Sequence, residues 1–153
     1  MIGTALLNLA RARERRRRLT DDEGGSVLLL TLGYALLAIA LVVVCVDVTS
    51  LYLAQKRLDA LADAAALAGA DGFAIVTGDD GPAAVLDSGD VHEQAQAIVE
   101  VTGGGATLIA ATTPDGLSAR VTVADTWHPP VLSPFVPGGV PLEATATSRT
   151  ALN

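Results

Sequence analysis

An uncharged apolar run over residues 26–46 limits the folds open to this chain more than any other feature of the sequence. As a helix, about 21 residues at roughly 1.5 Å each span about 31 Å, which matches the hydrocarbon core of a bilayer. The run is rich in leucine and valine, which favour insertion, and no charge opposes them. A buried core helix could be as apolar, but a chain of 153 residues has few elements to cover every face of it. The run therefore predicts a membrane-spanning helix.

The charges on either side of the run predict its orientation. Six arginines precede it: Arg11, Arg13, Arg15, Arg16, Arg17 and Arg18. Beyond Gly69 only Arg120 and Arg149 are basic, and residues 70–153 carry a net charge of −8 with histidine neutral. The positive-inside rule then places the N-terminus in the cytoplasm and an acidic domain outside it. An arginine run can also bind nucleic acid, but beside a span it is better explained as a topological anchor, so we expect no nucleic-acid partner.

Two kinds of processed N-terminus compete with this interpretation. A secretory signal has a shorter apolar core, about 7–15 residues, that leads directly to an A-x-A-like cleavage site. The best such site here, residues 66–68, comes well after the charged residues that follow the run, so we expect no ordinary signal cleavage. A lipoprotein would be acylated at Cys45, but the bulky Val44 precedes it. As the only cysteine, Cys45 cannot form an intramolecular disulfide, and we expect it to pack in the helix.

The fold class predicted from these patterns is α+β, in four segments. They are a basic cytoplasmic segment at 1–25, a transmembrane helix at 26–46, an Ala/Leu-rich extension of that helix outside the membrane at 47–70, and a small extracytoplasmic module at 71–153. Gly24 and Gly25 are expected to loosen the entry to the span. The helix is expected to end within residues 69–72, where two glycines occur.

One stripe of residues, spaced by three and four, runs along the predicted helix and is a candidate helix–helix interface. It consists of Gly33, Leu37, Ala40, Val44, Asp47, Leu51, Ala54, Leu58, Leu61 and Ala65. Asp47 lies where the apolar run ends. Either it is solvated at the level of the headgroups, or it pairs with a partner helix, because burying it unpaired would cost several kcal/mol.

The outer module reads as a short helix and an antiparallel sheet. We expect an acidic loop at 77–90, a helix at 91–101, and strands at 107–112 and 117–126. The turn between these strands, residues 113–116, has the sequence Thr-Pro-Asp-Gly, in which proline sets φ and glycine accepts a positive φ. A Pro-rich loop at 128–141 leads to a last strand at 142–151. With few aromatic residues the module can form only a modest core, and packing onto the Ala/Leu helix or onto a partner would help it.

Residues for catalysis or metal binding are present only as scattered types. His92 and His128 have no cysteine or clustered carboxylate at the spacing of a zinc site. Asp125, His128 and Ser133 include the atom types of a catalytic triad, but there is no nucleophile elbow. Four aspartates could bind calcium but lack the EF-hand spacing: Asp79, Asp80, Asp87 and Asp90. We therefore expect no enzyme, cofactor or metal.

Two motifs carry a resemblance to a known family. Asp22-Glu23-Gly24-Gly25-Ser26 precedes the apolar run, and Ala62-Asp63-Ala64-Ala65-Ala66-Leu67-Ala68 follows it. This arrangement, over residues 21–70, resembles the N-terminal domain of TadE/TadG-like proteins of the bacterial Flp (tight-adherence) pilus-assembly system. The resemblance implies an inner-membrane protein with one N-terminal helix and an extracytoplasmic domain, associated with assembling or anchoring the pilus.

The same resemblance makes Gly24 and Gly25 candidates for leader processing by a prepilin peptidase. A pilin-type leader would have glutamate five residues after the cleavage glycine, whereas this chain has Leu29 and Leu30 there. We therefore expect processing to be absent or inefficient. Larger TadG-like members carry a von Willebrand-type metal-binding domain, and the Asp-x-Ser-x-Ser motif of that domain is missing from this sequence.

Three functions follow from the sequence, in order of preference. The first is a non-enzymatic, single-span minor or anchoring subunit of a Tad-type pilus or secretion machine. Its partners would be membrane lipid, other subunits of the machinery and further copies of the same chain. The second is a membrane-tethered acidic module that captures a partner or ligand at the cell surface. The third is a membrane-bound hydrolase that uses Ser133 and His128.

Overall fold

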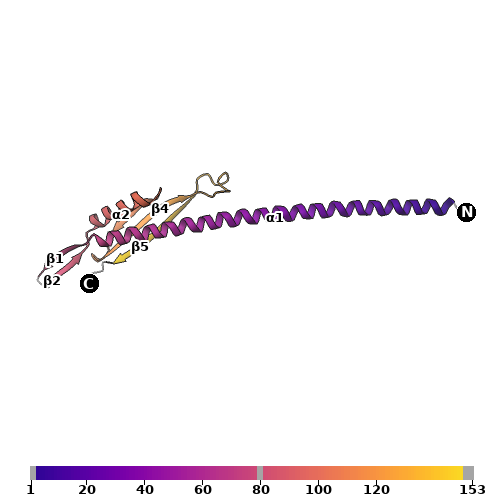
Figure 1. Cartoon of the computed structure of the whole chain (residues 1–153). Helices are drawn as coiled ribbons and strands as arrows, with labels where there is room; N and C mark the ends of the chain where they lie inside the picture. Colours follow the sequence, from indigo (N-terminus) through magenta and orange to yellow (C-terminus); the bar gives the residue numbers. More distant parts are fainter. Residues whose placement is uncertain (1–2, 79–80, 150–153) are drawn as a thin grey trace. The chain divides into compact units, whose positions relative to one another are not determined.

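A computed structural model describes residues 3–78 and 81–149 of the chain. Its elements follow in the order α1 (Gly3–Asp71), β1 (Ala74–Gly78), β2 (Gly81–Val85), α2 (Ser88–Thr102), β3 (Thr107–Thr112), β4 (Ser118–Trp127) and β5 (Val140–Arg149) (Figure 1). The chain divides into two compact units, Met1–Cys45 and Val46–Asn153. The predicted α+β class, with a long N-terminal apolar helix followed by a short helix and antiparallel strands, is confirmed.

Helix α1 passes through Gly24 and Gly25 without a break, so the expected loosening at the entry to the span is not seen. No proline occurs before Pro82, and the glycine penalty of about 1 kcal/mol per residue is small beside the preference of so many alanines and leucines for helix. The segment Gly25–Asp71 is long and apolar enough to cross a membrane, and its most apolar window is 0% buried. This apolar window is therefore not a buried core helix, whereas the later turns of α1 contribute to the core described below.

Polar side chains within the apolar run are few, and one of them is satisfied inside the helix. Thr31 Oγ1 donates a hydrogen bond to the carbonyl oxygen of Val27, at 2.8 Å. Such a bond to the preceding turn removes the cost of an unpaired hydroxyl in an apolar surrounding. This threonine is thus compatible with a helix that crosses a bilayer.

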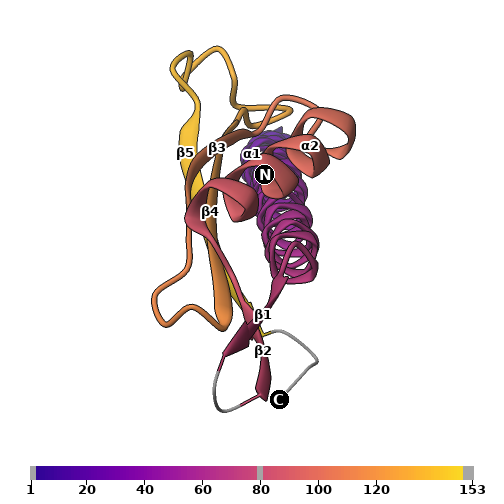
Figure 2. The ribbon, with the colours of Figure 1, turned by 90° about the vertical axis from the view of Figure 1, so that its left-hand side faces the viewer.

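The second unit, Val46–Asn153, is called the outer unit below. Its core lies on one face of an antiparallel sheet with strand order β3–β4–β5. Alternate residues of β4, Ala119, Val121 and Val123, are fully buried on that face. Helix α2 and the final turns of α1 lie on the same side of the sheet (Figure 2). The expectation that the module packs onto the Ala/Leu helix is confirmed, because one cluster contains residues of α1, α2 and the sheet: Leu58, Leu61, Ala62, Ala65, Ala66, Ala70, Leu86, Val91, Ala95, Val99, Ala111, Ala119, Val121, Val123, Ala144 and Ala146.

Small side chains on α1 allow this close packing. A Cβ atom at Gly69 would lie 3.0 Å from Cγ1 of Val91 and 3.3 Å from Cβ of Ala119. Gly69 therefore sits where α1, α2 and β4 meet. The alanine repeat that follows the span has a packing role within this chain, because Ala65 and Ala66 are completely buried.

Most predicted strands are found with small shifts in their ends. The strand at 107–112 coincides with β3, and the next strand begins and ends one residue later than predicted. The turn between them has Gly116 at φ +72°, as expected for its glycine. Strand β5 begins earlier than predicted because Val140 and Pro141 pair with the end of β4. Residues 150 and 151 of the predicted strand lie outside the described residues.

The predicted acidic loop at 77–90 is wrong for the part that is described. Strands β1 and β2 pair antiparallel, from Ala74 opposite Val85 to Gly78 opposite Gly81. Helix α2 begins at Ser88, three residues before the predicted start, because Asp87 caps it by accepting a hydrogen bond from the Gly89 N–H at 2.7 Å. Asp79 and Asp80 lie outside the described residues.

Candidate functional site

The structure divides the predicted stripe of α1 into two environments. In the Met1–Cys45 unit its members Gly33, Leu37, Ala40 and Val44 are exposed, with Leu37 at 64%. In the outer unit three members face the sheet and are buried in the core of the same chain: Leu58, Leu61 and Ala65. The sequence interpretation expected the module to pack onto this helix but did not identify these three stripe residues as the ones it covers. Leu51 and Ala54 are half-buried.

Asp47 is buried beside the Pro-rich loop. Only 6% of its surface is exposed, so the alternative that it is simply solvated is wrong. Its Oδ1 accepts a hydrogen bond from the backbone N–H of Val131 at 3.2 Å, whereas the buried Oδ2 has no partner among the described residues. Pairing of Asp47 with a partner helix stays a prediction, but one oxygen of the carboxylate already accepts a hydrogen bond within its own chain.

A second bond holds the end of β4 on the same helix. The indole Nε1 of Trp127 donates to Oγ of Ser50 at 3.1 Å. Ser50 lies one helical turn beyond Asp47. The Ser50–Trp127 and Asp47–Val131 bonds together fix the start of the β4–β5 loop against α1.

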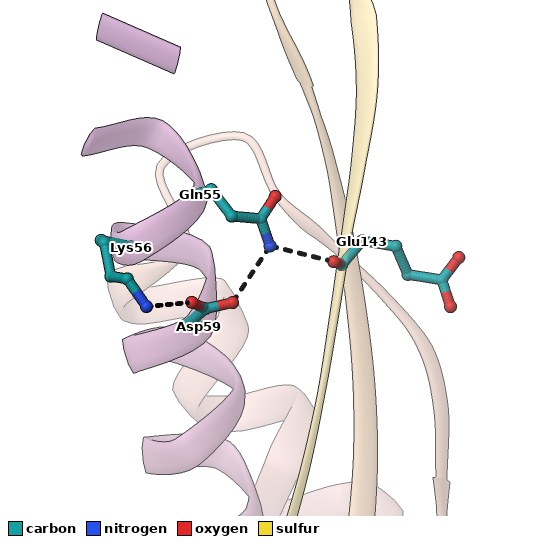
Figure 3. A network of polar contacts seen from close by, with 4 residues as sticks. All are labelled: Gln55, Lys56, Asp59 and Glu143. Carbon is teal, nitrogen blue, oxygen red and sulfur yellow. Dashed lines mark hydrogen bonds and ion pairs between the residues drawn. The ribbon is translucent and has the colours of Figure 1, made fainter. Parts of the chain in front are cut away.

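A third polar contact joins α1 to β5 farther along the helix. Gln55 Nε2 donates to Oδ1 of Asp59 at 3.0 Å and to the carbonyl oxygen of Glu143 at 3.1 Å (Figure 3). Lys56 Nζ donates to the other oxygen of Asp59, at 3.1 Å. The bonds from Gln55 and then Lys56 hold the pKa of Asp59 below its usual value. These solvent-exposed contacts orient Gln55 towards the sheet. The Lys56–Asp59 ion pair by itself contributes little to stability.

An open groove of about 510 Å³ lies in the outer unit between α1, the end of α2 and β4. Its lining is mostly small or apolar, with one charged residue on each of two sides, Arg57 of α1 and Asp125 of β4. Gly103 and Gly104 form the rim where α2 ends. The groove lacks a cluster of convergent polar groups, which a site for a small ligand requires.

The candidate catalytic residues are not joined by hydrogen bonds in the described part of the chain. Asp125 Oδ1 accepts from the N–H of the adjacent Thr126 at 2.7 Å, and both His128 and Ser133 are exposed. Among the described residues no group of three or more histidine, cysteine or acidic side chains could hold a metal ion. Asp87 serves as a helix cap, and the candidate leader residues Gly24 and Gly25 lie inside α1.

The described geometry thus consists of an exposed apolar helix and a small module fastened to the continuation of that helix. Residues 25–72 match the family model "Putative Flp pilus-assembly TadE/G-like". The match covers the apolar run, Asp47 and the alanine repeat through Gly69, so the predicted resemblance is confirmed over this segment. The comparisons with curated proteins and with solved structures gave no match. The sheet and α2 lie beyond the matched residues.

Proposed function

We propose that this chain is a non-enzymatic, single-span subunit of a Tad-type (Flp) pilus or secretion assembly, with a minor or anchoring role. The observation that carries the proposal is the match of residues 25–72 to the TadE/G-like pilus-assembly family. Support comes from the exposure of the apolar side chains in the same segment, because a bilayer or a neighbouring helix must cover them in the cell.

The proposed location is the bacterial inner membrane, with the N-terminus in the cytoplasm. The six arginines before the span and the acidic segment after Gly69 support this orientation through the positive-inside rule. A reporter that is active only outside the cytoplasm should therefore work when it is fused after Asn153. Activity of a cytoplasm-only reporter at the same position would contradict the proposal.

The proposed contact with other subunits is the membrane half of the stripe: Gly33, Leu37, Ala40 and Val44. The small residues Gly33 and Ala40 would allow a neighbouring helix to approach closely. Three members of the other half, Leu58, Leu61 and Ala65, are buried in the core of the same chain, which supports placing the contact inside the membrane. Further copies of the chain and other pilus subunits are both candidates for the neighbouring helix.

Photo-crosslinking within the span tests this contact with a matched control. A photoreactive amino acid replaces Leu37 on the stripe or Ile39 about 200° away on the other face, and the two wild-type side chains are equally exposed, at 64% and 61%. In cells that produce the whole machine, the Leu37 position should crosslink to a pilus-assembly protein or to a second copy, and the Ile39 position to lipid. Equal yields of protein crosslinks at both positions would refute the assigned face.

A further inference from the structure

The loop between β4 and β5 differs in chemistry from the rest of the outer unit. Residues 129–142 contain no charged side chain, although residues 70–153 as a whole carry a net charge of −8. Large apolar side chains in this loop are exposed, with Phe135 at 81% and Val131 at 44%. Phe135 and Val131 together are an exposed apolar pair in a neutral loop of an acidic domain, and covering them from water would be favourable.

Three contacts within the outer unit give the direction in which this loop runs. Glu143 of β5 is bonded to Gln55, Trp127 at the end of β4 to Ser50, and Val131 in the loop to Asp47. The contacted residues of α1 thus come progressively earlier in the chain, from Gln55 to Ser50 to Asp47, and Asp47 is the first residue after the apolar run in the sequence. In a membrane-anchored chain, Asp47 lies at the boundary of the hydrocarbon core.

The distance from Val131 to Phe135 keeps the loop at this level. Four residues span at most about 14 Å when fully extended, and bonds from the Phe135 and Val136 N–H groups to the Leu132 carbonyl make this segment shorter. The headgroup region is about 5–8 Å thick in each leaflet. The Asp47–Val131 bond therefore keeps Phe135 within reach of that region.

The backbone of this loop is also restricted, so that little conformational entropy would be lost when its exposed apolar side chains bind. Four prolines between residues 129 and 137 restrict the backbone. At its end, Gly139 has φ +67° and packs so closely on β4 that a Cβ atom there would lie 2.6 Å from Cγ2 of Thr126. A preorganised apolar loop binds with less loss of conformational freedom than a flexible one.

We propose that residues 129–139 form a membrane-interface anchor, in which Phe135 and Val131 insert into the headgroup–acyl boundary of the leaflet on the side of the outer module. This inference rests on the proposed membrane anchorage of α1. The anchor is neutral, so it binds through apolar area and needs no anionic lipid. It would hold the module down on the bilayer surface, beside the end of the span.

A fluorescence experiment on the full chain tests the anchor. The only cysteine is removed by Cys45→Ser, and Ser133→Cys in the loop carries an environment-sensitive nitrobenzoxadiazole label. The control label is placed by Thr112→Cys, an exposed position that pairs with Arg120, seven residues before Trp127. Seven strand residues span about 23 Å, so the control position lies far from the loop. Both proteins are reconstituted into vesicles of phosphatidylethanolamine and phosphatidylglycerol.

The expected result is a blue-shifted emission at position 133 that is quenched by lipids spin-labelled near the headgroup, with neither effect at position 112. Adding Phe135→Asp should abolish the shift at position 133 while the protein still floats with the vesicles. A water-exposed label at position 133 in a floating protein overturns the anchor but leaves the proposed function intact. A shift that grows with the protein-to-lipid ratio and is not quenched by lipid overturns it in favour of contact with a second copy. A protein that does not float with vesicles contradicts the membrane anchorage and the anchor loop together.

Discussion

Replacing Asp47 with alanine removes the acceptor that holds the backbone N–H of Val131 against α1. The Asp47–Val131 bond joins residues 84 positions apart, and the carboxylate that accepts it is 6% exposed. Its loss should loosen the β4–β5 loop and weaken the attachment of the sheet to the helix. The hydrogen bond between Trp127 and Ser50 lies one helical turn away, and it should weaken once the loop has loosened.

The size of the effect follows from opposing contributions. A hydrogen bond to a charged acceptor contributes about 1.5–3 kcal/mol. Alanine is a better helix former than aspartate by up to about 0.7 kcal/mol, and removing the unpaired Oδ2 also relieves part of the desolvation cost. A net loss of about 1–2 kcal/mol remains, which lowers Tm by roughly 5–10 °C for a unit of this size.

The assay uses the full chain in detergent micelles and follows the fluorescence of Trp127, the only tryptophan, during heating. Trp127 is bonded to α1 through Ser50, so its emission reports separation of the sheet from the helix. Asp47→Asn keeps an acceptor oxygen and the side-chain volume, and a neutral bond is about half as strong as a charged one. Its Tm should therefore fall between those of the wild type and Asp47→Ala.

Asp63→Ala is the matched control, since Asp63 is an exposed carboxylate on the same helix. Asp63→Ala should change the free energy of unfolding by no more than about 0.5 kcal/mol, as expected of a surface substitution, so its Tm should stay close to that of the wild type. The reasoning is refuted if Asp47→Ala melts at the same temperature as Asp63→Ala. It is also refuted if Asp47→Asn is less stable than Asp47→Ala, because the retained acceptor would then have no value.

Thermal unfolding of four further variants tests the packing of the outer unit and one of its turns. Leu58→Ala empties a core position and should lower the free energy of unfolding by about 2–5 kcal/mol, whereas Leu67→Ala at an exposed position of the same helix should change it by less than about 0.5 kcal/mol. Gly69→Ala should also lower Tm, because overpacking against Val91 costs about 1–3 kcal/mol and outweighs a gain in helix propensity of about 1 kcal/mol. Asp115→Asn tests the turn, where bonds from the Leu117 N–H and then from Ser118 hold the pKa of Asp115 below its usual value. The stabilisation from that depressed pKa is complete well above the unfolded-state pKa and is lost as the pH falls through the folded-state value, so the Tm difference from wild type should be full at pH 7 and shrink in acid. Equal losses at the two leucines, a Gly69→Ala protein more stable than wild type, or a pH-independent effect of Asp115→Asn would each contradict the corresponding assignment.

The sequence by itself determined the features that depend on local chemistry. The length and lack of charge of residues 26–46 predict a helix able to cross a membrane, and the structure has α1 there with its apolar side chains exposed. The Thr-Pro-Asp-Gly turn predicts the β3–β4 hairpin because proline and glycine restrict the backbone within four residues. The motifs on either side of the span carried the resemblance that the family match confirms over residues 25–72.

Only the tertiary structure decided what covers each surface. Periodicity placed Leu37 and Leu58 on one stripe, but it could not indicate that the sheet of the same chain covers Leu58 and leaves Leu37 exposed. The burial of Asp47 depends on a bond between residues 84 positions apart, and no local pattern signals a contact at that separation. The β1–β2 hairpin was missed for a related reason. The adjacent Asp79 and Asp80 suggested an acidic loop over residues 77–90. The residues on either side of them pair as strands instead, which satisfies their backbone hydrogen bonds. A helix face is a property of spacing, whereas its partner is set by the packing of the whole unit.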